Sequence, residues 1–210
     1  MIHRFDNANE KAMNPFDKTD DPRRRLLIQM LAAGAFSLES ASALAQIFGS
    51  RPEKLPPGRS IYRLQGQVQV DGQSATLQTP VTPTSTIETG KDAEIVFVQG
   101  QTSYIQRGNS RVVLERPSEP QSGFAAGLRL IAGALLSVFP KGTPQQLRTK
   151  TATVGIRGTG VYLEADPEQT YFCTCYGVAD VVANDDPESK DTVAATHHNR
   201  PLYIVSGAQK

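Results

Sequence analysis

Residues 93–105 read AEIVFVQGQTSYI, and this stretch decides the class of the fold. Two runs rich in β-branched and aromatic residues, which favour strands, stand on either side of the tripeptide QGQ at 99–101. The glycine in that tripeptide suits a tight turn, because glycine adopts backbone angles that other residues avoid. The stretch therefore predicts two short strands joined by a hairpin turn.

Strand-like runs and turn residues keep alternating in both directions from this hairpin. Turn residues occur at 71–72, 90–92 and 108–110. Strand-like runs occupy positions 111–115, 153–156, 160–165, 170–182, 193–198 and 202–205. The chain of 210 residues holds 17 glycines, 14 prolines and no tryptophan, and this composition favours many short strands. We expect an all-β domain, built as a β-sandwich or a β-roll.

One segment departs from the strand pattern. Apolar residues stand at positions 124, 128, 131, 135 and 138, which is the spacing of a helix with one buried face. Gly123 and Pro140 bound the segment, as helix-ending residues commonly do. We expect one inserted helix over about 124–139, lying across the β-domain. A helix that binds a partner or a membrane surface is the alternative.

The first 45 residues have the layout of a targeting signal. A polar stretch ends in three arginines at 23–25, an apolar run of 13 residues follows at 26–38, and the small residues ASALA stand at 41–45. The adjacent arginines and the mild apolar run favour twin-arginine export with cleavage before Gln46. We expect residues 46–59 to be a linker and 60–210 a periplasmic domain that is not an integral membrane protein. An uncleaved anchor or a buried helix is the alternative.

Charge and motif content narrow the functional classes. The net charge is +1, and it stays +1 without residues 1–45, because that segment holds six basic and six acidic residues. Such a balance gives no basic surface for phosphates, so we expect no nucleic-acid partner. The sequence also lacks the G-x-S-x-G and H-E-x-x-H motifs of hydrolases. We expect a non-enzymatic protein.

The chain contains one constellation that could carry chemistry. Cys173 and Cys175 share one face of a predicted strand, because strand side chains repeat every two residues. The polar stretch 184–191 predicts a hairpin loop that folds this strand against the one carrying His197 and His198. Pairing of Val182 with Asp191 would bring His198 opposite Cys175, and a shift by one position selects His197 instead.

Three interpretations of these cysteines stay open. Two thiolates and an imidazole would suit zinc or copper(I), so Cys173, Cys175, His197 and His198 are candidate metal ligands. In an oxidising compartment the two cysteines could instead form a strained disulfide. They could also be small buried residues that only fill the core.

Two stretches resemble the FecR family of bacterial periplasmic domains. Residues 66–97, which include GQVQV at 66–70 and IETGKDAEIVF at 87–97, are similar to that family's opening G-x-V … I-x-T-G-x-x-A meander. Residues 151–159, TATVGIRGT, resemble its V-R-G-T signature. The resemblance implies the periplasmic, signal-receiving half of a membrane-anchored sigma-factor regulator for iron uptake. Because the 22 residues before Arg23 cannot fold into a domain, we expect a FecR-like protein without the anti-sigma and transmembrane parts.

Within the signature, Arg157 stands between two glycines and could bind a carboxylate, either structurally or as an anchor for a ligand. The expected function is that of an exported binding or sensing domain that recognises an envelope partner protein, a glycan or a metal ion. The alternatives are a small metal- or redox-handling protein that uses the cysteines, and a structural envelope protein docked through 124–139.

Overall fold

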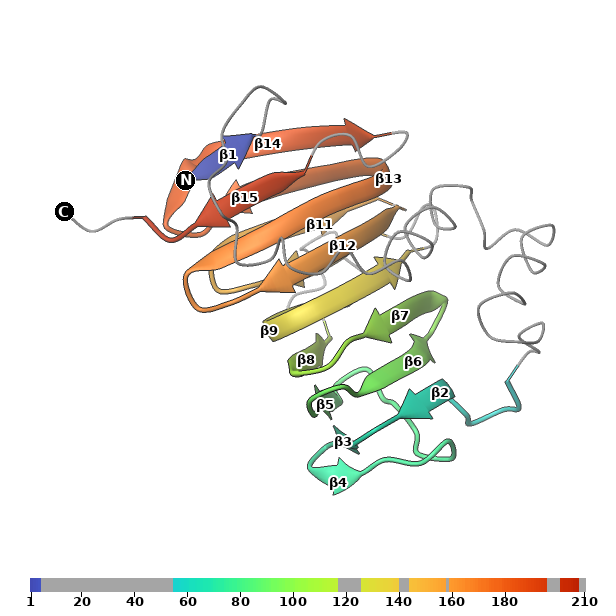
Figure 1. Cartoon of the computed structure of the whole chain (residues 1–210). Coiled ribbons are helices and arrows are strands. Elements are labelled where there is room, and N and C mark those ends of the chain that lie inside the picture. Colours follow the sequence, from blue (N-terminus) through green and yellow to red (C-terminus); the bar gives the residue numbers. More distant parts are fainter. Residues whose placement is uncertain (5–54, 117–125, 140–143, 158, 196–200, 208–210) are drawn as a thin grey trace.

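The fold is seen in a computed structural model that describes residues 1–4, 55–116, 126–139, 144–157, 159–195 and 201–207 (Figure 1). The described residues form strands and turns and contain no helix, which confirms the all-β prediction. In the same residues, no helix of the length and hydrophobicity of a membrane span occurs. Of the predicted signal over residues 1–45, residues 5–45 lie outside the described residues, whereas Ile2–Arg4 form strand β1.

The strands form two layers, which we name sheet A and sheet B. Sheet A runs in the order β1 (Ile2–Arg4), β15 (Leu202–Val205), β13 (Gln169–Ala183), β12 (Gly160–Ala165), β9 (Ala126–Val138), β7 (Thr102–Gln106), β6 (Glu94–Gln99) and β2 (Ile61–Gln65).

Sheet B runs in the order β14 (Asp186–Ala195), β13, β11 (Ala152–Ile156), β10 (Gln145–Arg148), β9, β8 (Ser110–Glu115), β5 (Thr86–Thr89), β3 (Val68–Val70) and β4 (Gln73–Ser74). Of these pairs only β9 and β10 are parallel.

Two long strands, β9 and β13, belong to both sheets. In β9, residues before Gly133 pair with β8 and β10 in sheet B, and residues from Gly133 onward pair with β7 and β12 in sheet A. In β13 the change of partners falls at Gly177. Both glycines have a positive φ, of 90° and 92°, which lets the strand turn the corner from one sheet to the other.

The main core lies between the two sheets. In sheet A, one row of side chains that face this core crosses four strands as Leu135, Leu163, Phe172 and Leu202, each at most 1% exposed. Buried residues of sheet B, such as Ile156, join the same core. Among the described residues, every fully buried member of this core lies between Ile61 and Ile204, and the partly buried Ile2 packs against it.

The predicted helix over 124–139 is wrong, because residues 126–138 form strand β9. Leu128 and Leu130 face the core before the bend, and Leu135 faces it after the bend. The turn at Gly133 interrupts the two-residue alternation, and the interrupted pattern imitates the spacing of a helix. Ile131, which a helix would have buried, is 43% exposed.

The predicted hairpin before the two histidines is partly wrong. The structure places a tight turn at residues 184–185, and β14 already begins at Asp186 where a loop was expected. Val182 pairs with Lys190 and not with Asp191. Strands β1, β4 (Gln73–Ser74), β5 (Thr86–Thr89) and β10 were not predicted.

Candidate functional site

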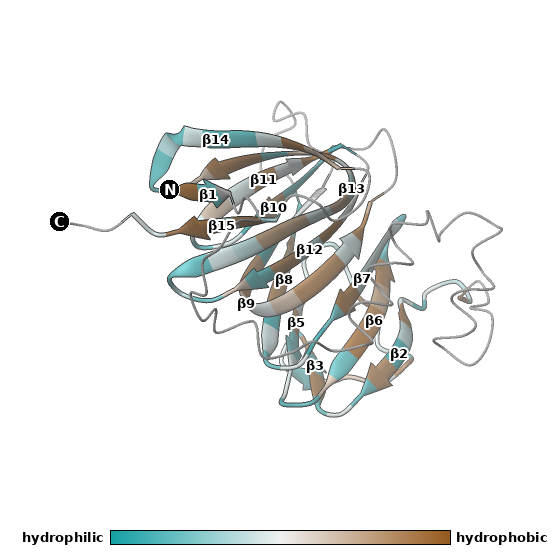
Figure 2. Ribbon diagram, turned by 45° about the horizontal axis from the view of Figure 1, so that its top comes forward, coloured by the Kyte–Doolittle hydropathy of each residue, from teal (hydrophilic) through white to brown (hydrophobic). Residues whose placement is uncertain are grey.

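The outer faces of the two sheets, which point away from the main core, differ in chemistry. On sheet B the outer face carries exposed ion pairs, in which Glu115 contacts Arg129 at 2.8 Å and Arg148 at 3.7 Å. On sheet A the outer face carries a second, separate apolar cluster. Figure 2 shows that β9 and β12 consist mostly of apolar residues, whereas the first part of β14, from Asp186, is hydrophilic. The outer face of sheet A is therefore the candidate functional surface.

We name this second assembly the Cys–Tyr cluster. Its centre is a row of side chains that pair across four strands: Ile105 (β7), Leu136 (β9), Tyr162 (β12) and Cys173 (β13). Leu136, Tyr162 and the two cysteines are buried, and partly buried residues pack around them, namely Ile105, Ala134, Val138, Tyr171 and Tyr176.

The two thiols of the cluster form no disulfide and share a hydrogen bond. Cys175 is the extra residue of a β-bulge, because Val161 pairs with Thr174 and Gly160 pairs with Tyr176. A hydrogen bond with the Cys173 thiol, reinforced by burial, raises the pKa of Cys175 well above its usual range. Both thiols are buried, and Cys175 therefore carries its proton at neutral pH. Such a thiol reacts slowly with electrophiles and releases a proton if it binds a metal ion.

Tyrosines continue the surface towards β15. The rings of Tyr162 and Tyr171 lie 6.2 Å apart between centroids, and those of Tyr171 and Tyr203 lie 5.1 Å apart, both pairs edge-on. In the same part of the sheet, the Tyr162 hydroxyl donates a hydrogen bond to the carboxylate of Glu164, a residue that is only 8% exposed. The rings are partly apolar and keep a polar tip, a combination that is common at recognition surfaces.

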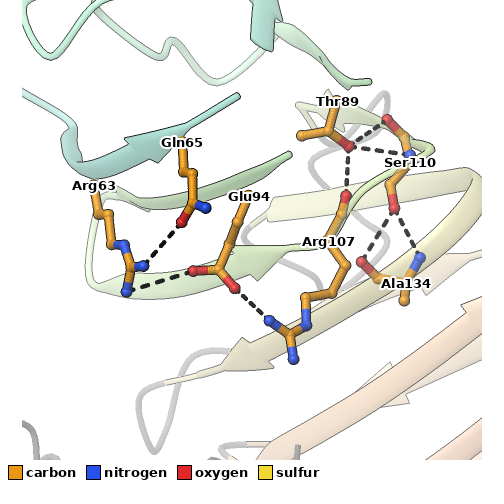
Figure 3. A network of polar contacts seen from close by, with 7 residues as sticks. All are labelled: Arg63, Gln65, Thr89, Glu94, Arg107, Ser110 and Ala134. Carbon is orange, nitrogen blue, oxygen red and sulfur yellow. Dashed lines mark hydrogen bonds and ion pairs between the residues drawn. The ribbon is translucent and has the colours of Figure 1, made fainter. Parts of the chain in front are cut away.

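At its other end the same sheet carries a charged network (Figure 3). Glu94 on β6 contacts Arg107, which directly follows β7, and lies 3.8 Å from Arg63 on β2. Arg63 also donates a hydrogen bond to Gln65. The sequence predicted none of this network, because its three charged residues, Arg63, Glu94 and Arg107, are far apart in the chain and share no spacing.

A second set of hydrogen bonds in Figure 3 stabilises the bend of β9 at Gly133. The Ser110 hydroxyl accepts a hydrogen bond from the backbone N–H of Ala134 at 2.9 Å, and the Thr89 hydroxyl donates to the Ser110 carbonyl at 3.2 Å. These bonds tie β5 and β8 of sheet B to the point where β9 enters sheet A. This group is structural.

The predicted site residues occupy different places. Arg157 is an exposed residue directly after β11, and its guanidinium lies 3.4 Å from the carboxylate of Asp180. The same carboxylate accepts a hydrogen bond from Thr192 at 2.8 Å. Arg157 therefore belongs to the polar outer surface of sheet B and is not part of the Cys–Tyr cluster.

The histidines His197 and His198 lie outside the described residues. Within the described residues, β14 pairs with β13 only from Gly177 to Ala183, and this pairing does not reach Cys175. Among the residues that the structure describes, no group of three His, Cys, Asp or Glu side chains is arranged to hold a metal ion. The metal site stays a prediction.

The signature stretch at residues 151–159 contributes a buried hydroxyl network. Thr151 donates to the Ile204 carbonyl at 3.0 Å and to the Thr170 hydroxyl at 2.8 Å, and Thr170 donates to Thr149 at 2.7 Å. Thr149 in turn accepts from the backbone N–H of Ala152 at 2.9 Å. The start of the signature thus joins the end of sheet B to β13 and β15, and its role here is structural.

Comparison with known proteins gives few matches. No family model matches the chain, and no curated protein matches it. Two crystal structures of a "putative anti-sigma factor" from Parabacteroides distasonis, at 2.50 and 1.65 Å resolution, are similar to it, each with 18% identity and a TM-score of 0.46. The matched region covers 60% of this chain and 56% or 57% of the other. This chain therefore corresponds to little more than half the length of that protein.

Proposed function

We propose that this chain is an exported, non-enzymatic binding or sensing domain of the FecR type. The observation that carries the proposal is the difference between the two outer sheet faces. Sheet B presents ion pairs to solvent, as an ordinary solvated surface does, whereas the part of sheet A from β9 to β15 presents the partly buried Tyr171 and Tyr203 beside a buried apolar cluster that includes Tyr162. An aromatic face on one side of a rigid two-sheet scaffold suits recognition of an envelope protein or a glycan.

The predicted signal and the FecR-like motifs support the same proposal. The layout of residues 1–45 is that of a cleavable export signal, which would deliver the domain to the periplasm. The motifs at 66–97 and 151–159 resemble those of periplasmic signal-receiving domains. Sensing needs a folded surface and a partner, and it needs no catalytic group.

Site-specific photo-crosslinking tests this proposal. The full chain, tagged at its C-terminus, would carry a photoreactive phenylalanine analogue either at Tyr203 or at Val178, which is 40% exposed. Tyr203 lies in the aromatic row of sheet A, and Val178 lies on the part of β13 that belongs to sheet B. We expect a discrete cross-linked product from the periplasmic fraction at Tyr203 and none at Val178.

Two results would contradict the proposal. Equal cross-linking yields at both positions would show that the aromatic row is not a recognition surface. The export part of the proposal is tested separately by N-terminal sequencing of the mature protein, which we expect to begin near Gln46. An uncleaved chain that stays in the cytoplasm would contradict export.

The contact between two buried thiols favours a second candidate function, metal handling. Cys173 and Cys175 supply two sulfur ligands in one cluster, and an imidazole from the predicted ligands His197 or His198 would complete a three-ligand site for zinc or copper(I). Reduced protein would then bind about one ion per chain, and Cys175→Ser would abolish binding. Elemental analysis that finds no metal in the reduced wild-type chain after loading contradicts this candidate.

A further inference from the structure

The first residues of the chain form the outermost strand of sheet A. β1 pairs antiparallel with β15, with Ile2 opposite Ile204 and His3 opposite Tyr203. Figure 1 shows β1 beside β15 and β14 at one end of the molecule, far from β2. Beyond β1, residues 5–54 separate it from Leu55, where the described part of the domain begins.

The contacts of β1 are those of an added strand. The backbone N–H of Val205 donates to the Met1 carbonyl at 3.2 Å, and the Val205 carbonyl accepts from the Met1 amino group at 3.1 Å. The Ser189 hydroxyl on β14 accepts from the N–H of Ile2 at 2.9 Å. The Ile2 side chain packs partly against the main core. Main-chain bonds together with a partly buried apolar anchor residue are how a peptide binds to a sheet edge.

The domain does not need β1 to complete its core. Among the described residues, every fully buried member of the main core lies between Ile61 and Ile204, so residues 46–210 retain all of these core residues. Removal of residues 1–45 would take away β1 and leave the outer edge of β15 with unpaired backbone groups, including the N–H and C=O of Val205. An open strand edge readily accepts another strand.

We propose that the outer edge of β15 is a strand-accepting site, filled in cis by β1 and filled after its removal by an extended segment of a partner protein. The removal of β1 by cleavage of the signal rests on the proposed function, whereas the existence of the strand-accepting site does not. Within one chain, a tether holds β1 at an effective concentration in the millimolar range, so a three-residue strand is enough to occupy the edge. A partner without that tether needs a longer strand or further contacts on the neighbouring tyrosines.

The geometry of β1 defines the chemistry of the partner segment. The position of Ile2 requires an apolar side chain, because it packs against the core beside Ile204. The next position stands opposite Tyr203, whose ring contacts Tyr171, which in turn pairs with Glu164. A basic or aromatic side chain suits that position. The partner is therefore an extended peptide segment in which apolar residues alternate with basic or aromatic ones.

A peptide-binding experiment tests the site without relying on export. The chain 46–210, labelled with ¹⁵N, is titrated with a synthetic peptide of residues 1–9, up to a few times about 1 mM, the effective concentration that a tether supplies. We expect saturable shifts of backbone amide signals in β15 and at Ser189. Ile2→Asp in the peptide should weaken binding about tenfold or more, because its apolar anchor is lost.

Matched variants of the domain identify the edge. Val205→Pro removes the N–H that donates to Met1 and should abolish binding, whereas Val205→Ala keeps that N–H and should bind as the wild type does. Circular dichroism checks that both variants fold, and the Ile2→Asp peptide tests the site even if Val205→Pro does not fold. Absence of shifts in β15, equal affinity of the Ile2→Asp peptide, or self-association of 46–210 through β15 that excludes the peptide would each overturn the proposal.

Discussion

Replacement of Gly133 by alanine should disrupt the corner at which β9 passes between the sheets. The φ of Gly133 is +90°, and a Cβ added there would lie 2.1 Å from the Ser110 Oγ and 2.6 Å from the Ser110 Cα. Backbone atoms cannot move aside cheaply, so Ser110 and the whole start of β8 must shift. The shift would also break the hydrogen bond from the Ala134 N–H to the Ser110 hydroxyl.

The expected loss in the free energy of unfolding is the sum of three contributions. A positive φ costs a residue with a Cβ about 1–2 kcal/mol, and steric overpacking adds about 1–3 kcal/mol. The lost hydrogen bond adds about 1 kcal/mol. The sum of about 3–6 kcal/mol is a large share of the about 5–15 kcal/mol by which domains are stable. Gly133→Ala should therefore unfold at much lower urea concentration or fail to fold.

Gly100→Ala is the matched control. Gly100 also has a positive φ, of 62°, but no atom lies within 4 Å of the position where its Cβ would stand. Gly100→Ala should therefore lower the free energy of unfolding only by the cost of a positive φ, about 1–2 kcal/mol. Urea unfolding of both full-length variants, followed by circular dichroism, gives the two free energies. Equal losses of stability in the two variants would refute the argument that the close approach of Ser110 is the reason why position 133 requires a glycine.

Two further predictions concern the buried hydroxyl network and the buried thiol. Thr151→Val removes the hydroxyl that bonds to Thr170 and to the Ile204 carbonyl, and should cost about 1–3 kcal/mol in urea unfolding. The exposed control Thr192→Val should cost about 0.5 kcal/mol or less, and similar losses in both would contradict the assignment. Because the pKa of Cys175 is raised in the folded state, the unfolded chain loses this proton first. Its contribution to stability is therefore full below the unfolded pKa of about 8.5 and falls above it, by up to about 1.4 kcal/mol per pH unit. Urea midpoints between pH 8 and pH 10 should drop less in Cys175→Ala than in the wild type, and equal drops would count against a buried, protonated thiol.

The sequence by itself determined where most strands lie. The runs that became β6, β7, β8, β12 and β15 were predicted to within one residue at either end. Their signal is local, because alternation of side chains and turn residues with a positive φ, such as Asp71 and Asn109, act within a few positions of the chain. The sequence also predicted that Cys173 and Cys175 lie on one face of a strand. This prediction needs no knowledge of the partner strands, because side chains two positions apart in a strand point to the same side.

Only the tertiary structure decided the rest, because backbone hydrogen bonds in a sheet join residues that are distant in sequence. Residues 126–138 hold leucines and alanines that suit a helix, yet partner strands on both sides, and on both sheets, make them a strand. The polar residues 186–191 read as a loop, although as an edge strand they face solvent and need no apolar alternation. The strand β1 depends on a partner about two hundred positions away, a pairing that no local pattern of residues can encode.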